Sequence, residues 1–116
     1  EQFAHALDAL IQKAQQQKLT LTDLTGASFT FNNFGYFGTN MGVQIILPPQ
    51  ATVLGMGKIE KKAWVVDDQI KIRSIANFIL AFDHRLLDGR DAGLFLSFLK
   101  ERIEKCTETT FETPLH

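Results

Sequence analysis

The sequence predicts an α+β fold with a mostly antiparallel or mixed sheet. Apolar side chains recur at helical spacing near both ends of the chain, and several short segments of strand composition lie between them, separated by turn residues. With 116 residues, 45% hydrophobic and 22% charged, the chain is long enough for one globular domain. A formal net charge of −1 argues against a nucleic-acid partner, and no apolar run approaches the roughly 20 residues of a membrane span.

The N-terminal part predicts a helix followed by a turn. The helix is expected over residues 2–18, where one face carries Phe3, Leu7, Leu10, Ile11 and Ala14. The threonines of KLTLTDLTG then indicate a turn that Gly26 closes.

The next segments predict two strands and a loop. Residues 28–33 alternate small polar side chains with phenylalanines, which predicts a strand with one buried face. Three glycines and an asparagine in residues 35–42 predict a loop. Residues 43–47, VQIIL, predict a strand that Pro48 and Pro49 stop, because proline cannot donate to an interior ladder.

The central segments predict further strands. Residues 51–60 are expected to be extended, and residues 61–75 resemble a hairpin with its turn at Asp67 and Asp68. Residues 78–82 are apolar on both faces, which is typical of an interior strand.

The C-terminal part predicts a second helix and a tail. Helical spacing returns after Gly89, with Asp88 or Asp91 available as the N-cap, on a face that carries Leu94, Phe95, Phe98, Leu99 and Ile103. Residues 106–116 form a polar, threonine-rich tail.

A sheet this apolar needs cover on both faces, and two helices can scarcely provide it. We therefore expect other polypeptide to cover it, either an N-terminal portion outside this chain or neighbouring subunits. The chain begins with Glu1 rather than methionine, which suggests a fragment or a processed piece.

The run AFDHRLLDGRDAG, residues 81–93, carries the clearest candidate for chemistry. His84 follows a predicted strand, and histidine, with an ordinary pKa of about 6.5, can take and return protons near neutral pH. A rigid position at the end of a strand suits a general base, although a buried, hydrogen-bonded structural histidine is the alternative. Asp88 is expected to pair with Arg85 or Arg90 and to fix the turn, a structural role favoured over direct catalysis.

Three blocks of the sequence resemble one family. DHRLLDG resembles the DHRxxDG signature of the dihydrolipoamide acyltransferases, the core components of 2-oxo acid dehydrogenase complexes. SFTFNNFGYFG and ILPPQATVLGMGKI resemble that family's strand-and-turn segment and the strand pair after it, in the same order and spacing. The likeness runs from about Ala14 to Lys105. It implies that residues 1–116 are the C-terminal portion of the catalytic domain, with a chloramphenicol-acetyltransferase-like two-layer α/β sandwich.

The resemblance implies a role for each site residue. His84 would be the general base that removes the proton from the coenzyme A thiol, so that the thiolate attacks an acyl-lipoyl thioester. The family's usual serine or threonine oxyanion donor corresponds to Asn32, whose amide N–H groups can also stabilise an oxyanion. Thr30, on the same strand face, is the alternative donor. Asn33 and Phe34 are expected to bind substrate, with Phe34 as a wall of the acyl pocket.

The resemblance also implies partners and cofactors. Coenzyme A is expected as a substrate and a lipoyl group on a domain outside this chain, with no metal, since Asp83, His84 and Asp88 lack a second ligand cluster. A homotrimer is expected, with His84 and Asn32 from different chains, within a larger symmetric core that binds the other components of the complex. The single Cys106 fits a reducing compartment, the cytoplasm or the mitochondrial matrix of a eukaryote.

Two other functions stay open at this point. The chain could be a scaffold fragment that assembles without catalysing. It could also belong to another HxxxDG coenzyme A-dependent acetyltransferase, such as an antibiotic acetyltransferase, although the two flanking blocks argue against this. Acetyl, succinyl and branched-chain members share these motifs, and the paired Asn32 and Asn33 slightly favour a branched-chain or acetoin-type enzyme.

Overall fold

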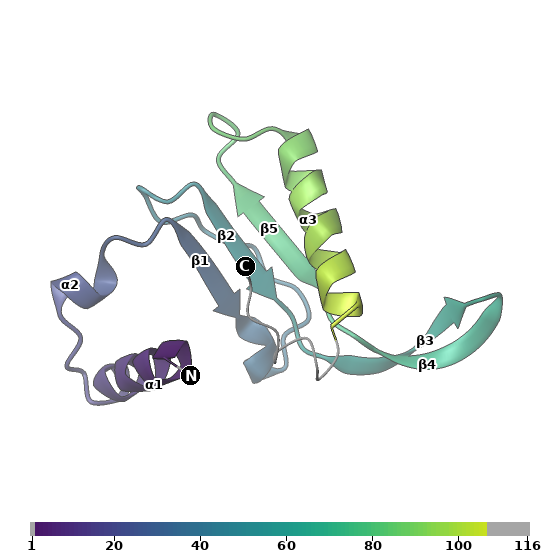
Figure 1. The fold of residues 1–116 in the computed structure, drawn as a ribbon, viewed down its shortest axis with the longest axis horizontal. Helices are drawn as coiled ribbons and strands as arrows, with labels where there is room; N and C mark the ends of the chain where they lie inside the picture. The colour runs from purple at the N-terminus through teal and green to yellow at the C-terminus, as the bar shows by residue number, and fades with distance from the viewer. Residues whose placement is uncertain (1, 107–116) are drawn as a thin grey trace.

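The computed structural model describes residues 2–106. From the N-terminus, its elements are α1 (Gln2–Gln15), α2 (Leu21–Leu24), β1 (Phe29–Asn33), the 3-10 helix η1 (Phe34–Phe37), β2 (Thr52–Met56), β3 (Glu60–Val66), β4 (Gln69–Ile75), β5 (Phe78–Phe82) and α3 (Gly89–Glu104) (Figure 1). This succession of helix, strands and helix confirms the predicted α+β class. Apart from Cys106, the predicted polar tail lies outside the described residues.

A three-stranded mixed sheet with the strand order β1-β2-β5 forms the centre of the fold. β1 runs parallel to β2, and β5 runs antiparallel to it, as Figure 1 shows. The central strand holds Val53 and Leu54, which are buried. Phe95 of α3 contacts Phe29 of β1, with ring centroids 6.2 Å apart, so that α3 covers one face of the sheet.

A second sheet consists of the hairpin β3–β4, which projects away from the central sheet (Figure 1). Its turn is formed by Asp67 and Asp68, which both adopt left-handed backbone angles, with φ of 54° and 57°. Two successive positive φ values give the tight turn whose twist matches that of the strands, so the predicted hairpin and its turn are confirmed.

Three sequence expectations are wrong in detail. Residues 43–47 are extended but pair with no strand among the described residues, because no neighbouring backbone completes a ladder. The strand expected over residues 51–60 ends at Met56, and strand structure resumes with Glu60 in β3. The loop expected over residues 35–42 contains most of η1.

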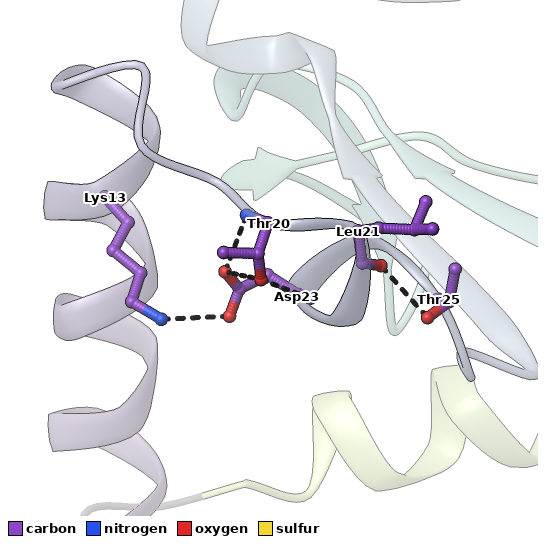
Figure 2. A network of polar contacts seen from close by, with 5 residues as sticks. All are labelled: Lys13, Thr20, Leu21, Asp23 and Thr25. Atoms are coloured by element: carbon purple, nitrogen blue, oxygen red, sulfur yellow. Dashed lines mark hydrogen bonds and ion pairs between the residues drawn. The ribbon is translucent and has the colours of Figure 1, made fainter.

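The first helix also ends earlier than expected, at Gln15. The threonine-rich segment after it forms the short helix α2, which begins with a capping box between Thr20 and Asp23 (Figure 2). Asp23 also pairs with Lys13 of α1, with an N···O distance of 3.0 Å. Backbone and side-chain hydrogen bonds from Thr20, with the contact from Lys13, lower the pKa of Asp23 to about 2.

Much of the apolar surface stays uncovered. Among residues 2–106, the buried hydrophobic residues are Val53, Leu54 and Ala92, and no residue of α1 is buried. The accessible surface is 10016 Å², whereas a compact monomer of this mass exposes about 6400 Å². These values agree with the expectation that the sheet needs cover beyond its two long helices. None of the helices in residues 2–106 combines the length and the apolar character that crossing a membrane requires.

Candidate functional site

His84 lies in a turn immediately after β5. The backbone N–H of Asp83 donates to the carbonyl of Ala51 at 2.9 Å, which continues the pairing of β5 with the chain before β2. His84 then leaves the sheet and is exposed, with its ring centroid 4.8 Å from that of Phe82. Within this chain by itself, His84 is thus not buried. His84 therefore lies at the end of a strand, where the sequence placed it, and its role as a general base stays a prediction.

Asp83 and Arg85 fix the turn that presents His84. The Asp83 carboxylate accepts hydrogen bonds from the backbone N–H of Arg85 at 2.9 Å and from its Nε and Nη2 at 3.0 Å and 2.6 Å. These bonds lower the pKa of Asp83 to about 2, so that the carboxylate stays ionised near neutral pH. The expected aspartate–arginine pair thus exists, but it is made by Asp83. The expectation that Asp88 pairs with Arg85 or Arg90 is wrong, since no such pair occurs in residues 2–106.

Asp88 is the N-cap of α3. Its backbone is extended, with φ of −101°, and its carboxylate accepts a hydrogen bond from the backbone N–H of Asp91 at 2.9 Å. An N-cap carboxylate satisfies a free N–H of the first helical turn and interacts favourably with the helix dipole. Of the two expected N-caps, the structure selects Asp88. Its carboxylate stabilises the helix that follows the His84 turn.

Asn32 lines a pocket of about 470 Å³ at the side of β1. The pocket is also lined by Phe34, by Thr30 and by Gln44 of the extended segment 43–47. Nδ2 of Asn32 donates to Oε1 of Gln44 at 3.1 Å. The hydroxyl of Thr30 donates to Oε1 of Gln50. Because a hydroxyl has one proton to donate, this bond favours Asn32 over Thr30 as a donor to a bound group.

Asn33 lies elsewhere. It lines a second hollow of about 200 Å³ together with Tyr36 and Lys58. Asn33 lines this second hollow and is absent from the lining of the Asn32 pocket. Of the two residues expected to bind substrate, the structure brings Phe34 to Asn32 and separates Asn33 from it.

His84 and Asn32 lie at opposite ends of the central sheet. Asn32 pairs with Gly55, which in turn pairs with Ile79 on β5, and His84 lies five residues beyond Ile79. At about 3.3 Å per residue, with two strand spacings of about 4.8 Å, the two backbones are roughly 19 Å apart. One chain therefore does not assemble both groups around one substrate.

Gln44 and Gly55 also belong to the surroundings of Asn32 and were not predicted from the sequence. Gln44 is the polar residue in the otherwise apolar run VQIIL, which is a signal that sequence inspection could have used. In the described range of 2–106, no group of three or more His, Cys, Asp or Glu residues could hold a metal ion.

Comparisons with known proteins identify the family. A model of the 2-oxoacid dehydrogenases acyltransferase catalytic domain matches residues 1–111. A curated relative, the dihydrolipoyllysine-residue succinyltransferase component of the 2-oxoglutarate dehydrogenase complex of Haemophilus influenzae, is 42% identical over 106 residues, which cover 91% of this chain and 26% of the relative. This relative gives no support to the slight preference for a branched-chain or acetoin-type enzyme.

Two solved structures share the fold. A probable dihydrolipoamide acetyltransferase from Listeria monocytogenes has a TM-score of 0.87 and 38% identity, covering 97% of this chain and 47% of that one. A dihydrolipoamide acetyltransferase of Azotobacter vinelandii, studied for the role of a serine, a histidine and an asparagine in its catalytic mechanism, has a TM-score of 0.83 and 28% identity, covering 90% and 43%.

These matches confirm the predicted fold, a mixed sheet with helices as in acyltransferase catalytic cores. The chain spans about a quarter of the length of the curated relative and about half of the Listeria chain. The chain belongs to the family of 2-oxoacid dehydrogenase acyltransferase catalytic domains.

Proposed function

We propose that this chain is the C-terminal portion of an acyltransferase that moves an acyl group between dihydrolipoamide and coenzyme A, in a 2-oxo acid dehydrogenase complex. One observation carries the proposal. In the Azotobacter enzyme the serine precedes the histidine by 52 positions, and the asparagine follows it by four. Asn32, His84 and Asp88 have the same separations. Asn32 stands where the Azotobacter enzyme has the serine, and both side chains can donate a hydrogen bond. Asp88 stands where that enzyme has the asparagine, and both side chains can cap a helix.

His84 acts as the general base. A thiol has an ordinary pKa near 8.5, so only a few per cent of it is ionised at neutral pH, and a positioned base accelerates its attack by about 10²–10⁴-fold. His84 takes the proton from the coenzyme A thiol, and the thiolate attacks the acyl-lipoyl carbonyl. When the tetrahedral intermediate collapses, the C–S bond to the lipoyl group breaks, and His84 returns its proton to the leaving sulfur. The Asp83–Arg85 pair and the Asp88 cap hold the turn in which His84 lies.

Asn32 supplies an N–H to the oxyanion of that intermediate, and Phe34 borders the space for the acyl group. Asn33 is proposed to contact the substrate from the neighbouring hollow that it lines. The separation of roughly 19 Å between Asn32 and His84 supports a site formed between two chains of a homotrimer. The uncovered apolar surface supports the same assembly, within a larger symmetric core that binds the other components of the complex.

Coenzyme A and a lipoyl group carried on a domain outside this chain are the proposed reactants, and no metal takes part in the proposed reaction. The proposed location is the cytoplasm or the mitochondrial matrix.

The experiment is an acyl-transfer assay with acyl-coenzyme A and dihydrolipoamide, using the protein at its full natural length. His84→Ala is expected to lower kcat by at least about 10²-fold while the assembly, measured by light scattering, stays intact. The matched control is His5→Ala, which removes an exposed histidine from α1 and should leave kcat unchanged. Asn32→Ala is expected to lower kcat by roughly 10²–10³-fold. Unchanged turnover in His84→Ala would exclude the base assignment, and an assembled wild type without turnover would establish the scaffold alternative.

A further inference from the structure

Gln44 occupies an unusual position in the extended segment 43–47. All three residues Val43, Gln44 and Ile45 line the Asn32 pocket, but Val43 and Ile45 are 96% and 85% exposed, whereas Gln44 is half-buried. The polar side chain of Gln44 is therefore less exposed than the apolar side chains on either side of it. This is the reverse of the usual arrangement for a segment at the surface.

Gln44 contacts Asn32 directly. Its Oε1 accepts a hydrogen bond from Nδ2 of Asn32 at 3.1 Å, and the two residues are 12 positions apart in the sequence. The terminal torsion of an asparagine side chain is broad and nearly two-fold, so a free carboxamide samples orientations that exchange its oxygen and nitrogen. The Oε1 acceptor of Gln44 selects the orientation in which the Asn32 nitrogen is on the Gln44 side.

Gly55 makes room for this contact. It is buried on β2, directly paired with Asn32. A Cβ at this position would lie 2.7 Å from Nε2 of Gln44 and 2.5 Å from Cε1 of Phe34. The space that a side chain would occupy at position 55 is thus taken by the Gln44 amide and the Phe34 ring.

We propose that Gln44 is a positioning residue for Asn32. With one N–H of Nδ2 donated to Gln44, the second N–H of the same nitrogen is held in one direction and is the donor available to the oxyanion. A donor that is oriented before the reaction needs no reorganisation as negative charge develops. This inference rests on the proposed function, in which Asn32 is the oxyanion donor. It adds Gln44 to the residues Asn32, His84 and Asp88 on which that function depends.

The test is a double-mutant cycle in the protein at its full natural length. Gln44→Met keeps the length of the side chain but removes the acceptor, and Asn32→Ser introduces a hydroxyl donor that does not depend on Gln44. Gln44→Met is expected to lower kcat about tenfold with an unchanged KM for coenzyme A, as expected when only a transition-state contact is weakened. In the Asn32→Ser protein, the same substitution should change kcat by less than about twofold. Gln12→Met on α1 is the matched control, with wild-type kcat.

The positioning role would be overturned if Gln44→Met lowered kcat equally in the wild type and in the Asn32→Ser protein. It would also be overturned if Gln44→Met left the kcat of the wild type unchanged. If Asn32→Ala lowers kcat but Gln44→Met does not, the proposed function stands and this inference fails. If the wild type assembles but shows no turnover, the proposed function fails, and neutron crystal structures, which distinguish an amide nitrogen with its hydrogens from an oxygen, then decide about Gln44. They should show one Asn32 carboxamide orientation in the wild type and more than one in Gln44→Met. A single unchanged orientation in both would exclude the role.

Discussion

Gly55→Ala perturbs the Asn32 pocket by one methyl group. Gly55 is buried on the central strand beside Asn32, and the added Cβ would lie 2.5 Å from Cε1 of Phe34, 2.7 Å from Nε2 of Gln44 and 2.9 Å from Cδ of Gln44. These are side-chain atoms, so the change is expected to displace the Phe34 ring and the Gln44 amide and to leave the strand pairing intact.

The size of the displacement sets the expected effects. Carbon atoms in contact are about 3.5–4.0 Å apart, so the Phe34 ring must move by about 1 Å. Overpacking of this kind costs about 1–3 kcal/mol of the free energy of unfolding. A shift of about 1 Å in a group that positions the reacting atoms lowers the rate by up to roughly 10²-fold. We therefore expect kcat to fall by about ten- to a hundredfold.

The assay compares kcat for acyl transfer and the free energy of unfolding in the wild type and Gly55→Ala, again at full natural length. The matched control is Gly93→Ala in α3, where, apart from its chain neighbours and the nearby backbone of α3, no heavy atom lies within 4 Å of the new Cβ. An alanine inside a helix should stabilise by about 0.5–1 kcal/mol and leave kcat unchanged. A Gly55→Ala protein with wild-type kcat and stability would refute the account of the pocket.

Two further predictions concern the turn around His84. Asp88→Ala should lower the free energy of unfolding by about 1 kcal/mol because α3 loses its N-cap, whereas Asp88→Asn, which can still cap, should lose much less; equal stability of all three proteins in thermal unfolding would contradict this. The pKa of Asp83 is lowered from 3.8 to about 2 by Arg85, so its contribution to stability is full above pH 3.8 and is lost as the pH falls towards 2. The stability difference between the wild type and Asp83→Asn should therefore shrink over this interval in acid unfolding experiments, and a constant difference would exclude the ion pair as its cause.

Features that depend on neighbouring residues were predictable from the sequence. The strand at 28–33 follows from side-chain alternation, and the hairpin turn at Asp67 and Asp68 follows from two residues that tolerate positive φ. The N-cap was narrowed to two aspartates, because capping involves residues within one turn of the helix start. The segment 43–47 was mispredicted as a strand because pairing requires a second backbone, which local composition does not reveal.

The candidate site, like the fold, has features that the sequence predicts and features that depend on the tertiary structure. From the sequence alone came its chemical groups: the histidine after the last strand, the aspartate four residues later and the asparagine pair before a glycine-rich loop. Their arrangement came only from the tertiary structure. In that structure Arg85 pairs with Asp83, and Asn33 lines a different hollow from Asn32. Gln44, 12 positions away in the sequence, accepts a hydrogen bond from Asn32. These outcomes depend on strand register and on the space left by Gly55, because contacts between distant segments are set by packing rather than by local backbone preference.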